Sequence, residues 1–261
     1  MKWCRRSRGL AALAASIALG IASGAQAAPD EIQVYIDELL APGEKGVELH
    51  MNYVPGGRRT PDYPGEVPPG GVFRFTPEIS WGLVAGWDMG IYIPFSDSAY
   101  QGGVRLDGTK LRVKRLVNPD ADGLFYGVNV ELAYSSYRVS PTHWDTEIRT
   151  IVGWRSGRWL VAANPILAVP IGSSRAGDSS AELELDIKVG YEVVPRFAIG
   201  FEQYSEFGPV NDLTFGSASG ETTFAVLDYE GKGWGLNFGV GRGWTEPVDK
   251  WVVKAILGFD F

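Results

Sequence analysis

The sequence predicts an all-β fold: a transmembrane antiparallel up-and-down β-barrel of about twelve strands, preceded by an N-terminal signal peptide. Three features carry this prediction. They are a basic and then apolar leader over residues 1–27, repeated segments of alternating apolar and polar residues, and a last segment, Trp251 to Phe261, whose apolar face reaches the final residue. After the leader, no apolar run approaches the ~18 residues that a membrane-spanning helix needs. A closed barrel is therefore the membrane-spanning structure open to this chain.

Residues 1–27 have the three parts of a cleaved secretory signal. The apolar core is Leu10 to Ile21, a small-residue cleavage site follows at Ala25-Gln26-Ala27, and the basic residues in front are Lys2, Arg5, Arg6 and Arg8. An uncleaved anchor is the alternative, but the apolar core is short for a spanning helix. Cys4 is the only cysteine, so cleavage leaves no disulfide, thiol nucleophile or thiolate metal site.

The mature chain is acidic. Cleavage removes four basic residues and no acidic ones, which takes the formal net charge from -7 to -11 and argues against binding of nucleic acid. The 34 glycines and nine tryptophans are many for a soluble protein, whereas membrane barrels commonly have Gly-rich strands and interfacial Trp. No phosphate-binding loop and no paired metal-ligand spacing occurs, so we expect no cofactor and no metal.

Residues 28–45 are expected to form a periplasmic or lumenal lead-in, and residues 46–261 the barrel. In the lead-in Ile32, Val34 and Ile36 alternate with polar residues, but residues 37–40 break the pattern. Whether this lead-in closes the lumen is left open by the sequence.

The first half of the barrel begins with strands at Gly46 to Val54, Val72 to Trp81 and Trp87 to Phe95, where every second residue is apolar. Residues 55–71 contain five prolines and no periodicity, so they are expected to form a surface loop. Gly103 to Leu116 changes phase in the middle, and a bulge at Asp107-Gly108 would restore it. A small extra hairpin there is the alternative.

The later strands alternate more regularly. After the turn at residues 118–123, Leu124 to Tyr134 has apolar residues at every second position, and Ala181 to Val193 sets six apolar residues against five charged ones and a glycine. The other expected strands are Trp144 to Trp154, Trp159 to Ile171, Phe197 to Tyr204, Thr222 to Asp228, Gly233 to Arg242 and Lys250 to Phe261.

An even strand count places both ends in the periplasm, and the alternate connections are long, as in bacterial outer-membrane barrels. Two aromatic girdles follow from this topology. Beside the short turns and the C-terminus lie Trp81, Trp87, Trp154, Trp159, Tyr191, Phe197, Trp234 and Phe261, and beside the long loops lie Tyr53, Phe73, Tyr134, Trp144 and Trp251. A soluble lipocalin-like barrel or β-sandwich is the alternative, because alternation does not separate an inside from an outside.

Charged residues are expected to line the lumen. The candidates are Glu48, His50, Arg74, Glu78, Asp88, Arg112, Lys114, Glu131, Glu147, Arg149, Glu182, Glu184, Asp186, Lys188, Glu202 and Lys254. In a barrel this narrow such side chains meet across the interior. They indicate either an ion-paired, largely closed interior or a narrow passage that slightly favours cations.

The C-terminal residues Leu257, Phe259 and Phe261 are interpreted as the signal read by the barrel-assembly machinery. The expected location is the outer membrane of a Gram-negative cell, with outer-membrane lipid and lipopolysaccharide as partners. Arg58 and Arg59, in the first long loop, are the residues that would meet lipopolysaccharide phosphates.

Catalysis is not expected. Ser140, His143 and Asp145 are close in sequence, but they fall in a loop where nothing fixes a nucleophile against a base. His50 shares its face with Glu48 and is interpreted as a hydrogen-bonded wall residue.

Several short phrases resemble a known family. They are Glu31-Ile32-Gln33-Val34-Tyr35, Leu49-His50-Met51-Asn52-Tyr53, Ile91-Tyr92-Ile93-Pro94-Phe95, Asn164-Pro165-Ile166-Leu167, residues 233–243 and Trp251-Val252-Val253-Lys254. Together they are similar to the outer-membrane barrel family associated with the MetA pathway of phenol degradation. The resemblance implies an outer-membrane location and uptake of small hydrophobic or aromatic compounds.

Two classes of function remain. The first is a narrow passive channel or uptake barrel for small solutes. The second is a closed structural or surface-interaction barrel, with a lipid-modifying enzyme as a weaker third reading. An open lumen favours the first class, and a lumen blocked by the lead-in and by ion pairs favours the second.

Overall fold

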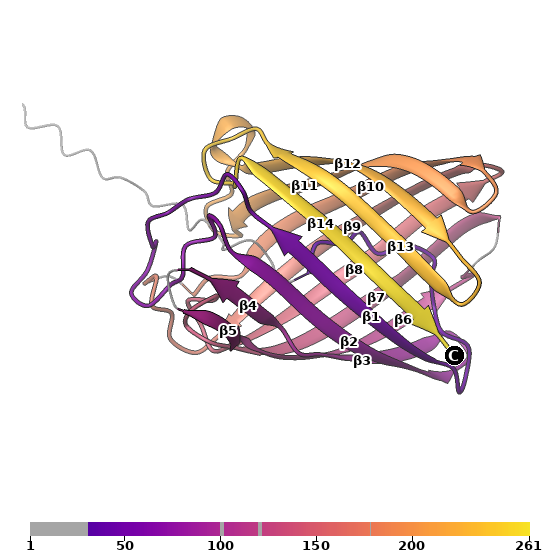
Figure 1. The fold of residues 1–261 in the computed structure, drawn as a ribbon, viewed down its shortest axis with the longest axis horizontal. Coiled ribbons are helices and arrows are strands. Elements are labelled where there is room, and N and C mark those ends of the chain that lie inside the picture. Colours follow the sequence, from indigo (N-terminus) through magenta and orange to yellow (C-terminus); the bar gives the residue numbers. More distant parts are fainter. Residues whose placement is uncertain (1–30, 100–101, 120–121, 178) are drawn as a thin grey trace, which may run out of the picture.

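The computed structural model describes residues 31–99, 102–119, 122–177 and 179–261; the expected signal peptide lies outside them. They form a closed antiparallel β-barrel of twelve strands (Figure 1). The expected fold class is thereby confirmed. Two barrel strands are each broken into two segments, so the labels run to β14: β1 Lys45–Tyr53, β2 Phe73–Val84, β3 Trp87–Tyr92, β4 Phe95–Ser98, β5 Gly103–Leu106, β6 Gly108–Val117, β7 Gly123–Ser135, β8 Trp144–Ser156, β9 Trp159–Ile171, β10 Glu182–Val194, β11 Phe197–Pro209, β12 Gly220–Glu230, β13 Trp234–Gly243 and β14 Trp251–Asp260.

The barrel closes between its first and last strands. β1 pairs with β14 from Gly46 opposite Asp260 to Tyr53 opposite Val253, and it pairs with β2 on its other side. Beyond β14, Phe261 and Lys45 exchange two backbone hydrogen bonds of 3.0 and 2.9 Å. The last residue of the chain thus belongs to the closing seam.

In the part of the chain that the structure describes, no helix is both long and apolar enough to cross a membrane.

The two broken strands lie side by side. Pro94 separates β3 from β4, where its missing N–H interrupts the ladder. Asp107 separates β5 from β6. Residues on one face of a regular strand are an even number of positions apart, but Leu106 and Thr109 are both exposed on the outer wall and are three positions apart. The phase shift expected here is therefore present. β4 and β5 also pair with each other, so they form a hairpin that prolongs the two strands.

Apolar side chains cover the outer wall and polar ones face inward. In β10, Val189 is exposed, whereas Asp186 and Lys188 are buried in the lumen. Trp154 and Trp159 are exposed near the turn end of the barrel, where the short turns and the C-terminus lie, and Trp144 is exposed near the opposite, loop end. This is the reverse of a soluble barrel and fits a lipid-facing wall.

β11 reaches Pro209, five residues beyond its expected end at Tyr204. The reason is continued pairing: Ser205 and Glu206 lie opposite Glu221 and Gly220 of β12. Polar residues at these positions hid the extension from a search for alternating apolar residues.

Residues 31–41 lie inside the barrel and continue to the turn end, where β1 begins (Figure 1). Two apolar clusters hold them. Val34 and Tyr35 pack with inward residues of the wall, among them Leu116, Phe125 and Ile151, and Ile32 packs with Val54, Phe224, Val226 and Val252.

Candidate functional site: the lumen and its N-terminal segment

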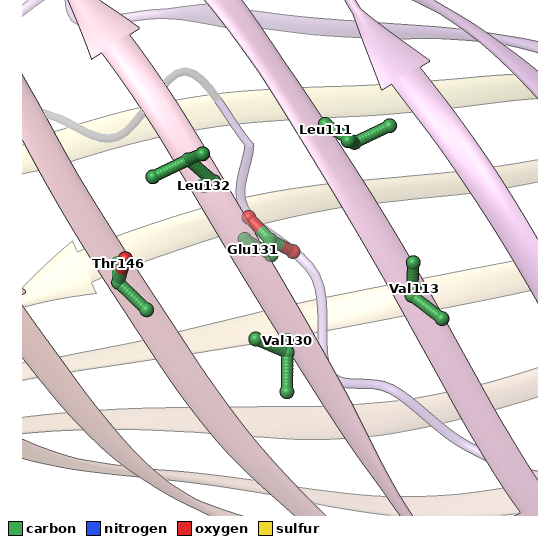
Figure 2. Close-up of a pocket in the computed structure, with 6 residues that line it drawn as sticks. All are labelled: Leu111, Val113, Val130, Glu131, Leu132 and Thr146. Atoms are coloured by element: carbon green, nitrogen blue, oxygen red, sulfur yellow. The ribbon is translucent and has the colours of Figure 1, made fainter.

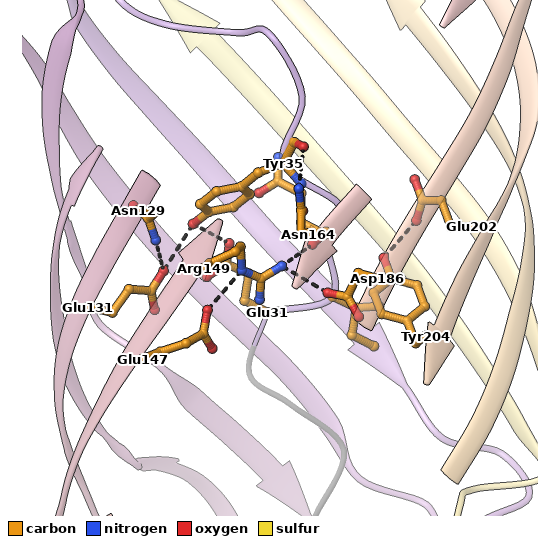
Figure 3. A network of polar contacts seen from close by, with 12 residues as sticks. Glu31, Tyr35, Asn129, Glu131, Glu147, Arg149, Asn164, Asp186, Glu202 and Tyr204 are labelled. Atoms are coloured by element: carbon orange, nitrogen blue, oxygen red, sulfur yellow. Dashed lines mark hydrogen bonds and ion pairs between the residues drawn. The ribbon is translucent and has the colours of Figure 1, made fainter. Parts of the chain in front are cut away.

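The segment formed by residues 31–41, called here the lumen segment, is tethered by side chains of the wall. Asn164 of β9 binds Tyr35 twice: Tyr35 N–H donates to its Oδ1 at 2.6 Å, and its Nδ2 donates to the Tyr35 carbonyl at 3.0 Å. Arg149 donates to the carbonyl of Gln33 at 2.9 Å, and Lys254 donates to that of Ile32 at 2.9 Å. Backbone groups that no sheet satisfies are thereby paired (Figure 3).

The hydroxyl of Tyr35 is the centre of a polar network. Its oxygen lies 2.9 Å from Glu31 Oε1 and 3.1 Å from Glu131 Oε1, and its one hydrogen can be donated to either carboxylate; the hydroxyl of Tyr92 lies 3.1 Å away. Glu131 also accepts from Asn129 Nδ2 at 2.8 Å (Figure 3). The ring of Tyr35 therefore bridges the lumen segment to the wall formed by β3 and β7.

A second anchor lies near the turn end. Arg155 of β8 donates from Nε and Nη2 to the two carboxylate oxygens of Asp37, both at 2.7 Å. The Asp37 side chain is fully buried. Bidentate pairing with a buried carboxylate is among the stronger polar contacts in proteins, so it fixes the position of the lumen segment along the barrel.

Ion pairs between inward side chains connect most of the expected lining residues. Arg112 binds Glu78 at 2.7 Å and Asp88 at 2.5 Å, and Lys114 lies 3.4 Å from Asp88. All four are inward residues of neighbouring strands. They form one compact charged patch on the wall.

Further ion pairs join inward residues of β6 with β7, and of β8, β10, β11, β12 and β14 with one another. The pairs are Arg149 with Glu147 at 2.8 Å and Asp186 at 2.9 Å, Lys188 with Glu202 at 3.2 Å and Asp228 at 2.9 Å, Lys110 with Glu131 at 3.1 Å, and Lys254 with Glu202. The charges thus lie close enough to neutralise one another, as buried charges must.

The remaining candidates lie elsewhere on the inner wall. His50 and Glu48 of β1 lie beside Glu78, Arg74 of β2 is buried, and Glu182 and Glu184 are half-buried on β10 near the loop end.

At the C-terminus, Phe259 and Phe261 are exposed on the outer wall, and Leu257 is half-buried in β14. Leu257 and Phe259 thus belong to the strand that closes the barrel, and Phe261 follows it directly.

Neutral residues of the site were missed by reasoning from charge. Asn164, Tyr92 and Tyr204 all face inward and make polar contacts in the lumen. Asn164 is the only side chain in β9 with an amide, charged or hydroxyl group, and that is the signal by which the sequence could have identified it.

Described residues of the outer wall line hollows at two places. One, of about 260 Å³, is lined by Leu111, Val113, Val130, Leu132 and Thr146, with Glu131 behind them (Figure 2). The other, of about 450 Å³, lies at the break between β5 and β6 and includes Tyr134 and His143. Their apolar linings suit contact with lipid chains.

His143 contributes to loop packing. Its Nδ1 lies 2.7 Å from the carbonyl oxygen of Ser135, and its ring stacks on Tyr134 and contacts the ring of Tyr137 at a tilt. Ser140 Oγ lies 3.4 Å from Thr142 Oγ1. These contacts use both groups to order the loop.

The first long loop is closed by its own charges. Arg58 binds Glu66 at 2.7 Å and Asp62 at 3.0 Å, and its N–H donates to Asp249 at 3.2 Å. Burial raises the pKa of the Asp249 carboxyl group. Arg58 is thus engaged within the loop, whereas Arg59 is exposed.

No protein-family model matches the sequence, and a search of curated proteins found no significant match. Solved structures of similar shape exist. The COG4313 outer membrane channel from Pseudomonas putida F1 aligns with a TM-score of 0.61 at 11% identity, over 88% of this chain and 100% of that one.

Two porins are also similar. The KdgM porin aligns with a TM-score of 0.55 at 12% identity, over 83% of this chain and 99% of its own, and the NanC porin with 0.55 at 13% identity, over 82% and 98%. At such low identities the likeness concerns the fold. The chain therefore has the barrel fold of these outer-membrane porins and of this channel.

Proposed function

We propose that this protein is a narrow passive channel of the outer membrane and that the lumen segment sets its bore. The observation that carries the proposal is the inner wall. It presents charged and hydrogen-bonding side chains to the lumen segment. Asn164, Arg149 and Arg155 are among those that bind this segment, each at a different residue. Polar interiors of this kind are characteristic of water-filled barrels.

Small hydrophobic or aromatic compounds are the proposed solutes. The resemblance to the barrel family of phenol degradation supports this class, and so do the aromatic side chains on the inner wall. Tyr92, Tyr204 and Phe224 are inward residues of three different strands, and the last two are in contact with each other. Acidic residues outnumber basic ones in the chain, which favours a weak preference for cations.

The test is permeation through the refolded, leaderless protein. Planar-bilayer recording is expected to show discrete conductance steps with weak cation selectivity. Liposome swelling is expected to be faster with phenol-sized aromatic solutes than with oligosaccharides. The absence of conductance, in protein whose folding is verified by heat-modifiable gel migration, contradicts the proposal.

A closed structural barrel is the second candidate, and the number of tethers on the lumen segment favours it. Its signature is the absence of conductance in the parent protein. For either candidate, we propose cleavage after residue 27 and contact of the loop end with lipopolysaccharide. N-terminal sequencing of the purified protein tests the cleavage.

A further inference from the structure

Three potential metal ligands converge on the inner wall at the middle of β1. His50 Nε2 lies 3.3 Å from Glu78 Oε2 and 3.4 Å from Glu48 Oε2. One ligand atom from each residue falls within 4.8 Å of the others. The histidine is 2% exposed, and so is the Glu78 side chain.

The strand geometry explains this convergence. Glu48 and His50 are two residues apart in β1, so the pleat directs both into the lumen. Glu78 of β2 lies directly opposite Glu48 in the β1–β2 register. Backbone pairing, which is rigid across two neighbouring strands, therefore positions all three side chains.

This arrangement sets two carboxylates directly across from each other, which is destabilising without a compensating cation. Arg112 compensates part of the charge, because its Nε and Nη2 bind Glu78 Oε1 at 2.8 and 2.7 Å. That contact leaves Glu78 Oε2 directed at His50. Glu48 is 30% exposed and pairs with His50.

The distances fit ligation better than direct ion pairing. Charge-assisted N–H to O bonds are usually about 2.7–2.9 Å long, and the two contacts of His50 exceed that range. Four ligands at about 2.1 Å in a tetrahedron are separated by about 3.4 Å. Of the two ring nitrogens of His50, Nε2 contacts both carboxylates, whereas Nδ1 is buried without a hydrogen-bond partner among the described residues. The ring is therefore directed into the cluster through Nε2.

We propose that Glu48, His50 and Glu78 bind a divalent transition-metal ion of the Zn²⁺ class inside the barrel. One imidazole nitrogen and two carboxylates are ligands that Zn²⁺ accepts, and three protein ligands leave a fourth position for water or a solute. Arg112 acts behind Glu78, holding its carboxylate in orientation, as outer-shell groups do at metal sites. Such a site has no signature in the sequence, because Glu78 is far from His50 along the chain and approaches it only through the strand register.

The test uses the leaderless, untagged protein, refolded in detergent and freed of metal. Zn²⁺ bound after equilibrium dialysis is measured by mass spectrometry, and Co²⁺ is used as a probe with visible ligand-field bands. We expect one ion per chain, and at least about a tenfold loss of affinity in His50→Ala and in Glu48→Gln. His143→Ala is the matched control, since it removes the only other histidine, and is expected to bind like the parent.

Glu48→Gln is expected to fold, because it keeps the Glu78–Arg112 contact and the size of the side chain. A loss of affinity in this variant therefore cannot be attributed to misfolding. Heat-modifiable migration confirms that each variant is folded. Equal affinity in His50→Ala and the parent, or no saturable site in the parent, overturns the proposal and leaves His50 as an ion-paired wall residue. Binding is measured in detergent, so the result is independent of whether the barrel conducts.

Discussion

At the scale of single residues, Asp37 of the lumen segment has a fully buried carboxylate, which requires a charged partner. Arg155 is that partner and binds it in a bidentate manner. Arg155→Ala is expected to weaken docking of the segment by about 2–5 kcal/mol, the usual cost of leaving a buried charge unpaired. Hydrogen–deuterium exchange of the amides of residues 31–41 measures the effect, and we expect it to become at least tenfold faster.

Arg158→Ala is the control for this experiment, since Arg158 lies in the same turn and is exposed. Exchange is expected to stay at the parent rate in that variant. If both substitutions speed exchange equally, the Asp37 contact does not anchor the segment.

Asn164 carries the second residue-scale prediction. Asn164→Ala leaves the Tyr35 N–H and carbonyl without their partners, at a cost of about 1–3 kcal/mol for each buried group left unpaired. The Tyr35 amide is expected to lose its protection from exchange, whereas Asn211→Ala, in an exposed loop, leaves it unchanged. Full protection in Asn164→Ala would show that the backbone of Tyr35 is held by other groups.

At the scale of elements, the end of the lumen segment packs directly on β2. A Cβ added at Gly82 would press against the carbonyl oxygen of Ala41, whereas one added at Gly190 meets only Leu160 Cβ at 3.9 Å. Gly82→Ala is therefore expected to displace the segment at a cost of about 1–3 kcal/mol. Gly190→Ala is expected to be neutral. Exchange rates at residues 38–44 distinguish them, and identical rates contradict the close packing.

The closing seam provides another element-scale prediction. Deletion of Phe261 removes both its backbone hydrogen bonds to Lys45 and an exposed ring. Slower assembly is expected, detected as loss of heat-modifiable migration and of protease protection. Phe261→Ala keeps the backbone bonds, so it reports on the ring alone. Phe215→Ala, which removes an exposed ring from a loop, is the control and should assemble normally.

Strands were predictable where alternation was unbroken. Apolar and charged residues alternate at nearly every position of the expected strand Ala181 to Val193, and β10 spans Glu182–Val194. The phase change at Asp107 was also visible, because an odd spacing between outward residues requires an irregular position. The break at Pro94 was less visible, since the apolar run continues through Ile93 to Phe95.

At the scale of the whole molecule, the barrel was predictable from the sequence, but the position of the lumen segment inside it was not. Inward charges and outward aromatics follow from period-two alternation, which any closed barrel shares. The path of the lumen segment depends on side-chain contacts such as Arg149 with Gln33 and Asn164 with Tyr35, which join residues more than a hundred positions apart. No local pattern encodes such contacts, so the sequence left the location of the lead-in open.

The most direct test compares single-channel conductance of the leaderless protein with that of a variant lacking residues 30–41. If the lumen segment sets the bore, the parent shows small discrete steps and the deletion shows clearly larger ones, with both proteins heat-modifiable. Equal conductance in the two folded proteins would contradict a resident constriction. The absence of conductance in both proteins would identify a barrel that is closed by the side chains of its own wall.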